Sequence, residues 1–462
     1  MIMKIKKSLL SVIAMLLFSG MAFSQIVVSV EPTSEVGTIK PMNAANNGPN
    51  GPTFKAYKAL RVPYGRTHDT PLGEVWSSHV VDINQIFPDW SANVNNPKSY
   101  DFDLTDEMLQ DMIKAGTEPF FRLGQSIEHE SKKYGIYPPK DYKKWAKICE
   151  HIIRHYTEGW ADGYKWDITY WEIWNEPDLD DPDERWKTDP RTWGGTQEQF
   201  YELYEVTAKH LKKCFPHLKI GGPAFANPRK YGPPFLDYLK KTDTPIDFFS
   251  WHMYHRRPVR VSEDVHKVRE ILDEKGFTEV ESILNEWNYN KSWTEKNYYS
   301  RYVRRSIKSA AFMAGVMSEC QNGPVDMLMY YDLRPNTTWN GAFMPHTYDI
   351  LPAYWALYYW AELVDFGTQV KSQCAEKDIY TTAAKSADGK LRLLLTRYNE
   401  DDSVTDPKGV TVAVPQGYKV ASIRLTDSQK ELDRRTEPAV EPLVLTLESN
   451  AVALIELLPL AL

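Results

Sequence analysis

The sequence predicts an α/β fold: an eight-stranded (β/α)8 TIM barrel followed by a C-terminal β-sandwich that the N-terminal strand joins. Three observations lead to this prediction. Apolar strand-like runs alternate with helical spacing of apolar residues, and the alternation continues to eight units. A glycine-rich dinucleotide fingerprint, which would favour a doubly wound sheet, does not occur. Beyond about Phe366 the pattern changes to short strands and turns.

Residues 1–24 have the pattern of a secretory signal peptide. Lysines at positions 4, 6 and 7 precede an apolar run over 9–18, and small residues stand before Gln25. The apolar run is too short for a membrane-spanning helix, and no cysteine follows the cleavage site to carry a lipid. We expect export to the periplasm or the extracellular space, with a mature chain that begins near Gln25 and has no membrane span.

Residues 25–50 are expected to form an N-terminal strand and a linker. The β-branched run 26–30 is followed by a polar stretch rich in Asn, Gly and Pro. This strand is expected to pack on the β-sandwich, so that the start and the end of the chain meet.

Residues 51–365 are assigned to the barrel. The expected strands are 59–62, 80–86, 119–123, 170–174, 219–222, 248–254, 282–285 and 327–331. The expected helices are 105–115, 141–157, 197–214, 234–241, 262–275, 298–320 and 354–363. Gly116, Gly159 and Gly276 follow three of these helices, where a left-handed terminal residue is favoured.

Residues 366–462 are assigned to the β-sandwich accessory domain. Short apolar strands separated by turn residues are expected at 379–382, 391–396, 410–414, 420–425, 443–447 and 452–457.

Composition excludes several classes of protein. A hydrophobic content of 42% excludes a disordered or fibrous chain, and a net charge of -7 without a Lys/Arg stripe argues against a nucleic-acid partner. Cys149, Cys214, Cys320 and Cys374 lie far apart without C-x-x-C spacing, so we expect mostly buried free thiols with at most one disulfide.

Two Asn-Glu pairs stand at the ends of predicted strands. Glu176 ends the fourth strand, in Trp-Asn-Glu-Pro, and Glu286 ends the seventh. The carboxyl ends of barrel strands meet at one mouth, where barrel enzymes keep their active sites. Strand alternation is expected to place Glu172 and Trp174 on the same face as Glu176, with Asn175 on the other face. Two carboxylates facing one cleft form the pair used by retaining glycosidases, about 5 Å apart. The alternative is two ordinary surface glutamates.

These motifs resemble clan A glycoside hydrolases, and their surroundings resemble family 39, which contains β-xylosidases and α-L-iduronidases. The likeness covers nearly the whole mature chain. Its motifs, fairly specific together and weak separately, are Trp-Asn-Glu-Pro at 174–177, Ile-Leu-Asn-Glu at 283–286, Arg-Thr-His at 66–68, the segment 100–119, His-Met-Tyr at 252–254, and Asp332 with Trp-Asn-Gly-Ala-Phe at 339–343.

The resemblance implies that Glu176 is the general acid/base and Glu286 the nucleophile. It also implies that Arg66 and Tyr254 donate hydrogen bonds to Glu286. The other residues expected to bind or support the substrate are Asn175 at the sugar 2-hydroxyl, His252 beside the acid, His68, Gln125, Trp287, Asp332 and Trp339. For Arg66 and His252 the alternative is a structural hydrogen bond at the barrel rim. The division of roles fits elementary chemistry, because an acid needs burial to hold its proton and a nucleophile needs donors to stay ionised.

Two loops are expected to determine substrate specificity. Residues 124–129 read Gly-Gln-Ser-Ile-Glu-His, whereas xylosidases of the family commonly have a Gly-Phe-Met-Pro-like turn there. That loop is expected to contact the sugar, so a plain β-xylosidase assignment does not follow. The long loop 179–196 contains Trp186 and Trp193, for which sugar stacking and loop packing are equally good interpretations.

No cofactor and no metal are expected. The acidic run 178–184 lacks the glycine and the ligand spacing of an EF-hand. His252 and His255 have no third ligand at useful spacing, and retaining hydrolysis needs no metal.

We therefore expect a secreted, retaining exo-glycoside hydrolase that cleaves a terminal glycosidic bond of a plant or host glycan. It would act by double displacement through a glycosyl-enzyme intermediate on Glu286, with an oligosaccharide or polysaccharide as its substrate. The alternatives are a non-catalytic carbohydrate-binding protein on a TIM barrel and, among enzymes, an inverting mechanism with carboxyls roughly 6.5–9.5 Å apart.

Overall fold

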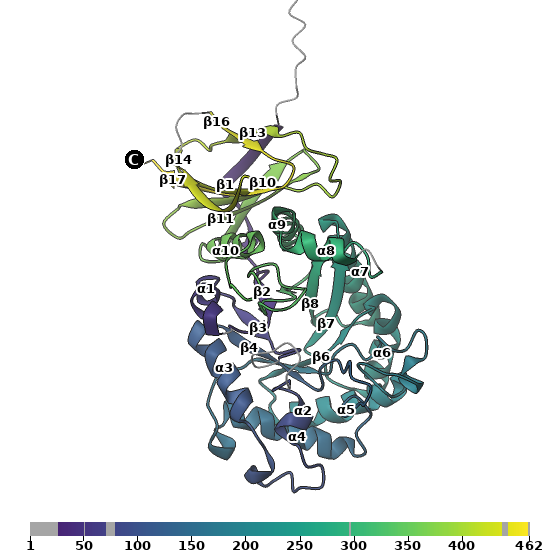
Figure 1. Cartoon of the computed structure of the whole chain (residues 1–462). Helices are drawn as coiled ribbons and strands as arrows, with labels where there is room; N and C mark the ends of the chain where they lie inside the picture. Colours follow the sequence, from purple (N-terminus) through teal and green to yellow (C-terminus); the bar gives the residue numbers. More distant parts are fainter. Residues whose placement is uncertain (1–25, 50, 71–78, 295–296, 437–441, 461–462) are drawn as a thin grey trace, which may run out of the picture.

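The computed structural model describes residues 26–49, 51–70, 79–294, 297–436 and 442–460. Eight parallel strands close into a barrel, which confirms the predicted fold class (Figure 1). In order around the barrel they are β2 (Ala44–Asn46), β3 (Tyr64–Arg66), β4 (Glu118–Leu123), β5 (Tyr170–Ile173), β6 (Lys219–Phe225), β7 (Phe248–His255), β8 (Glu281–Tyr289) and β9 (Met327–Tyr330). The predicted signal peptide, residues 1–24, lies outside the described residues.

Helices cover the outside of the barrel (Figure 1). The α-helices are α1 (Phe54–Ala59), α2 (Ile83–Ile86), α3 (Asp103–Ala115), α4 (Tyr142–Thr157), α5 (Gln197–Cys214), α6 (Pro228–Thr242), α7 (Pro258–Lys275), α8 (Asn297–Arg304), α9 (Ile307–Gln321) and α10 (Pro352–Val364). Short 3-10 helices are η1 (Gly51–Thr53), η2 (Pro97–Ser99), η3 (Trp160–Asp162) and η4 (Arg185–Lys187). Gly116 and Gly276 end α3 and α7 in the left-handed conformation, as their positions predicted.

The first two barrel strands are not the ones that the sequence predicted. Residues 59–62 lie at the end of α1 and beyond it, and 80–86 include α2 instead of a strand. The true first strand, β2, lies within 25–50, which was expected to be strand and linker on the sandwich. Both β2 and β3 have only three residues, too few for an alternation pattern. Two strands were predicted before β4 and two others are observed there, so β5 is still the fourth barrel strand and β8 the seventh.

The C-terminal strands form one nine-stranded sheet in the order β15-β14-β17-β12-β11-β10-β1-β13-β16. The N-terminal strand β1 lies inside it, antiparallel to β10 and parallel to β13, so the chain start joins this sheet as predicted. The strands are β1 (Ile26–Thr38), β10 (Thr368–Cys374), β11 (Ile379–Lys385), β12 (Leu391–Arg397), β13 (Lys408–Ala413), β14 (Tyr418–Asp427), β15 (Lys430–Thr436), β16 (Leu443–Leu447) and β17 (Ala451–Pro459).

The sheet is buried on both faces near its centre. In β12, Leu393 and Leu395 belong to the sandwich's own core, whereas Leu394 packs into the core shared with the barrel. Helices α9 and α10 lie between the sheet and the barrel (Figure 1). Nearly every residue of α9 is buried, which agrees with an apolar pattern that runs all around the helix. The sandwich therefore packs against one side of the barrel through α9 and α10.

The four cysteines are unpaired. Cys149 and Cys320 are buried, and Cys214 and Cys374 are half-buried, consistent with the expectation of mainly buried thiols. Among the helices of the described residues, none combines the length and the apolarity needed to cross a bilayer.

Candidate active site

Arg66 is the centre of a buried hydrogen-bond network inside the barrel. It is the last residue of β3, and it is fully buried. Its Nε donates to Glu172 Oε2 at 2.7 Å, Nη1 to Glu286 Oε1 at 2.7 Å and Nη2 to Asn175 Oδ1 at 2.6 Å. A guanidinium holds its donors in one rigid plane. This side chain therefore fixes the relative positions of groups from β5, from the loop after it and from β8.

Glu286 lies on β8 with a donor at each carboxylate oxygen. Tyr254 Oη, from β7, donates to Oε2 at 2.6 Å, and Arg66 donates to Oε1. Only 5% of Glu286 is exposed. Burial raises the pKa of this carboxyl, and the Arg66 guanidinium acts in the opposite direction. Both donors hold the carboxylate in one orientation, which is the requirement for a nucleophile.

Glu176 follows β5 on a segment with unusual backbone geometry. Its φ is +45°, and its backbone is held on both sides: its N–H donates to Ala224 O at 3.1 Å and its carbonyl accepts from Thr192 Oγ1 at 2.8 Å. The side chain is 8% exposed. Burial raises the pKa of its carboxyl to about 7. Glu176 can therefore carry a proton near neutral pH, as a general acid must.

The predicted alternation of faces along 171–176 is wrong beyond Ile173. Strand β5 ends there, and Trp174 has a φ of +74°. The turn brings Asn175 to Arg66 instead of leaving it on the opposite face from Glu176. Trp174 in turn points into the protein, where its Nε1 donates to Thr192 O at 3.0 Å. The alternation of side chains along a strand therefore could not predict the directions of Trp174, Asn175 and Glu176, because residues with positive φ interrupt the strand geometry.

The imidazole of His252 lies between the carboxylates of Glu176 and Glu286. Its Nδ1 is 2.7 Å from Glu176 Oε1 and its Nε2 is 3.5 Å from Glu286 Oε1. Burial lowers the pKa of this imidazole to about 4, so it is neutral at neutral pH and carries one ring proton. With that proton on Nε2, facing Glu286, Nδ1 accepts a hydrogen bond from protonated Glu176. Through His252, the protonation state of Glu176 thus depends on the charge of Glu286.

The spacing of the two carboxylates fits the retaining arrangement. One ligand atom each from Glu176, His252 and Glu286 lies within 4.8 Å of the others. Carboxyl groups of retaining glycosidases are about 5–5.5 Å apart. The sequence analysis expected no third metal ligand near His252. That expectation is wrong, because Glu176 and Glu286 offer two further donor groups at a spacing that suits a metal ion. Metal independence stays a prediction.

The remaining predicted site residues divide into three groups. His68 is buried, with Nε2 3.8 Å from Glu286 Oε1, so it lies beside the pair. Asp332 accepts hydrogen bonds from Arg334 and Thr337 and organises the loop after β9 instead of facing the carboxylates. Trp287 does not reach the site at all. It is fully buried and its ring packs on Phe312 of α9 and on Tyr330.

A polar cavity of about 950 Å³ opens beside the network. Its lining includes Gln125, Glu128, His129, Trp90 and Trp339, so side chains of the loop 124–129 line it, and the contact of this loop with the sugar stays a prediction. Glu176 and Glu286 are not part of that lining. The Trp339 ring lies 4.9 Å from the ring of Tyr254, which donates to Glu286, so the cavity adjoins the carboxylate pair through these two rings.

The aromatic residues near the mouth have separate roles. Trp293 is 64% exposed, and its ring lies 5.3 Å from the Tyr254 ring and 5.7 Å from the Trp339 ring. An exposed ring beside the site is suited to stacking on a sugar. Trp193 of the loop 179–196 instead packs edge-on against Trp174, which favours the loop-packing interpretation for that residue.

Sequence reasoning missed several members of the network. Glu172 was not among the predicted site residues, and it accepts from Arg66, Ser250 Oγ at 2.6 Å and Asn285 Nδ2 at 2.5 Å. Asn46, from β2, accepts from Arg66 Nη1 at 3.1 Å. Glu172 could have been found from its position four residues before Glu176 on a buried strand. Asn46 gave no signal, because its strand was not recognised.

Comparison with known proteins decides the family. The sequence profile described as glycosyl hydrolases family 39 matches residues 79–341, more than half of the chain. The chain belongs to glycosyl hydrolase family 39. The matched segment contains both Glu176 and Glu286, whereas Arg66 and Asn46 lie before it and are brought in by the fold.

Two sequence relatives and one solved structure are similar to this chain. The chain is 31% identical over 166 residues to a β-xylosidase of Caldicellulosiruptor saccharolyticus, covering 34% of this chain and 31% of that one. It is 26% identical over 251 residues to a β-xylosidase of Geobacillus stearothermophilus, covering 48% and 46%. The chain thus matches less than half the length of these two relatives. The structure of a glucosidase from Croceicoccus marinus has the same fold, with a TM-score of 0.76 at 22% identity over 95% of this chain and 100% of that chain.

The titration of Glu176 predicts the alkaline limb of the pH profile of this family 39 protein. With a pKa of about 7, Glu176 loses its proton as pH rises through neutrality, so kcat/KM is expected to fall there. On the acid side kcat/KM is expected to fall when Glu286 becomes protonated. The measurement is kcat/KM against pH on an aryl glycoside, for the wild type and for Glu176→Gln, which should lose the alkaline limb.

Asp178 supplies the control for this assignment. Its pKa is also raised to about 7 by burial, but its carboxylate accepts from the backbone N–H groups of Ala226 and Asn227. Asp178→Asn should keep the alkaline limb. A limb that survives in Glu176→Gln and disappears in Asp178→Asn would contradict the assignment.

Proposed function

We propose that this protein is a retaining glycoside hydrolase in which Glu286 is the nucleophile and Glu176 the general acid/base. The observation that carries the proposal is the contrast between two carboxylates whose reachable atoms lie within 4.8 Å. Glu286 has Arg66 and Tyr254 as donors, whereas Glu176 is buried with a pKa of about 7 and a neutral histidine beside it. Burial leaves the pKa of Glu286 above its ordinary value, but its two donors favour the ionised form, whereas Glu176 carries a proton up to about neutral pH.

The reaction would proceed in two displacements. In the first, a Glu286 oxygen forms a bond to the anomeric carbon, the glycosidic carbon–oxygen bond breaks, and the Glu176 proton passes to the leaving oxygen. In the second, Glu176 takes a proton from water, the water oxygen bonds to the anomeric carbon, and the ester bond to Glu286 breaks. Asn175 would hold the sugar 2-hydroxyl during both steps, and the hydrogen bond from Arg66 to its Oδ1 supports this role by fixing the orientation of the amide.

The substrate we propose is the terminal sugar of a plant or host glycan, cleaved by exo action. The relatives named β-xylosidase support a pentose-like sugar, and the loop 124–129 in the cavity wall is where this chain can differ from them. We further propose that the protein is exported, on the pattern of residues 1–24. Sequencing the N-terminus of protein recovered outside the cytoplasm should give a chain that begins near Gln25.

The decisive experiment is hydrolysis of defined plant and host oligosaccharides followed by NMR. We expect release of a terminal sugar whose anomeric configuration, in the first minutes before mutarotation, equals that of the substrate. An inverted product would overturn the retaining mechanism. Saturable sugar binding without any product after long incubation would favour the alternative, a carbohydrate-binding protein on a barrel.

A further inference from the structure

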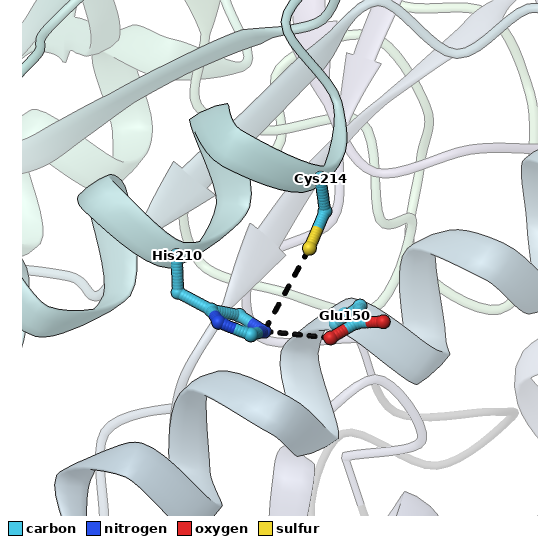
Figure 2. A group of neighbouring side chains, drawn as sticks. All are labelled: Glu150, His210 and Cys214. Atoms are coloured by element: carbon cyan, nitrogen blue, oxygen red, sulfur yellow. Dashed lines mark hydrogen bonds and ion pairs between the residues drawn. The ribbon is translucent and has the colours of Figure 1, made fainter.

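Three side chains that metals favour meet on the outside of the barrel, between α4 and α5. Glu150 comes from the middle of α4, and His210 and Cys214 stand one turn apart on α5 (Figure 2). One donor atom from each lies within 4.8 Å of the others. None of the three contacts Glu176, Glu286 or Arg66 in any interaction of the described residues. This cluster therefore has no part in the site proposed above.

The geometry of the cluster is close to that of a three-ligand metal site. His210 Nε2 lies 2.6 Å from Glu150 Oε2 and 3.9 Å from Cys214 Sγ (Figure 2). In a tetrahedral zinc site with bonds of about 2.0–2.3 Å, neighbouring donor atoms are roughly 3.3–3.8 Å apart. The Cys–His spacing is slightly wider than this range, and the Glu–His spacing must widen by roughly 0.8 Å for an ion to lie between the two donor atoms.

We propose that Glu150, His210 and Cys214 bind a divalent ion of the zinc type, with water completing the coordination. The ligand set of one carboxylate oxygen, one imidazole nitrogen and one thiolate suits Zn²⁺ and its softer analogue Cd²⁺, and it is unsuited to Ca²⁺ or Mg²⁺. Both α5 residues are partly exposed, so an ion can reach them from solvent. The site joins two barrel helices and is independent of the proposed hydrolytic function.

The charges around Glu150 are arranged like the outer shell of a metal ligand. Arg154 Nε donates to Glu150 Oε1 at 2.8 Å, and Lys147 Nζ contacts both oxygens at 2.8–2.9 Å. Ligating carboxylates are commonly held by such outer hydrogen bonds. Lys147 is one-third exposed, so its ammonium can move to solvent when an ion binds, while Arg154 keeps Oε1 in place.

Cadmium titration of the full chain tests the proposal directly. After treatment with a chelator and a reductant, the protein is titrated with CdCl2 and ZnCl2 by calorimetry, and the ultraviolet charge-transfer band of a cadmium–thiolate bond is followed. We expect one equivalent to bind with that band and to raise the melting temperature. Cys214→Ser should abolish the band, and Cys214→Ser and His210→Ala should each weaken binding at least tenfold.

Two control variants separate this site from other metal binding. Cys374→Ser removes the other half-buried thiol, and Glu176→Gln alters the cluster at the barrel mouth; both should keep the band and the affinity. A missing cadmium–thiolate band overturns the proposal, as does a band that persists in Cys214→Ser. Far-ultraviolet circular dichroism of each variant checks folding, and Cys214→Ala serves as a second variant at that position.

Discussion

Replacing Glu286 with alanine is expected to lower kcat/KM by at least about 10⁴-fold on every glycoside, including those with activated leaving groups. The physical reason is that Glu172, the other carboxylate bound to Arg66, cannot replace Glu286, since Arg66, Ser250 and Asn285 hold it in place. The measurement is initial rate on an aryl glycoside together with the proposed oligosaccharides. Glu286→Gln, which keeps contacts for Arg66 and Tyr254, should lose activity to a similar degree.

The matched control lies on the same strand. Glu281 begins β8 at the opposite end of the barrel, where it pairs with Lys219 and accepts from Tyr170 Oη. Glu281→Ala should keep activity within a few-fold of the wild type. A small anion such as azide, placed in the space that Glu286→Ala leaves, should restore turnover and give a glycosyl azide of inverted configuration. Hydrolysis at wild-type rate in a folded Glu286→Ala variant would disprove the assignment.

Replacing Glu176 with alanine is expected to separate substrates by their leaving groups. Alkoxide leaving groups need a proton in the transition state, so natural oligosaccharides should lose about 10²–10⁴-fold in kcat/KM. Activated aryl glycosides should lose far less, because their leaving groups depart unprotonated. The measurement is kcat/KM across a series of aryl glycosides of rising leaving-group pKa, which should show a steeper dependence than the wild type.

The second step distinguishes Glu176 from a merely structural residue. Without a general base for water, the glycosyl-enzyme should accumulate, and azide, which needs no deprotonation, should react with it to give an azide of retained configuration. Glu184→Ala, in the loop after Glu176 and mostly exposed, is the matched control and should behave like the wild type. Equal losses across all leaving groups would argue against Glu176 as the acid.

Much of the barrel could be predicted because its later units have strong local patterns. Helix α5 was predicted at its observed bounds, since its apolar spacing begins after a Thr196 capping box. Strands β2 and β3 could not be predicted. They have three residues each, and the apolar residues mistaken for strands, such as Val80 and Ile86, are buried in a turn and a short helix. Over so short a stretch, a run of apolar residues can indicate either a strand or a buried turn or helix, and the sequence does not distinguish them.

The site was partly predictable for a related reason. Glu176 and Glu286 were found because both belong to recognisable strand units, and Arg66 and Tyr254 through the family resemblance. Glu176 follows β5, whereas Glu286 was expected to end its strand and instead lies within β8, which continues to Tyr289. Trp287 was misplaced because its neighbour Glu286 faces the barrel interior, so Trp287 itself must face the helix layer. The turn at Trp174 was invisible to strand alternation. Its left-handed geometry is held by the loop that returns to Thr192, far along the chain.

The double pairing of Arg66 has a consequence for the lifetime of the reaction intermediate. When Glu286 becomes an ester in the proposed mechanism, its negative charge disappears. An arginine with that carboxylate as its only partner would then be a buried, uncompensated cation, which is costly. Here Glu172 is ion-paired to Arg66 Nε at 2.7 Å and forms no covalent bond in the proposed mechanism. Glu172 thus acts as a permanent counter-ion, and Arg66 need not move or change its electrostatic balance while the sugar is attached and released.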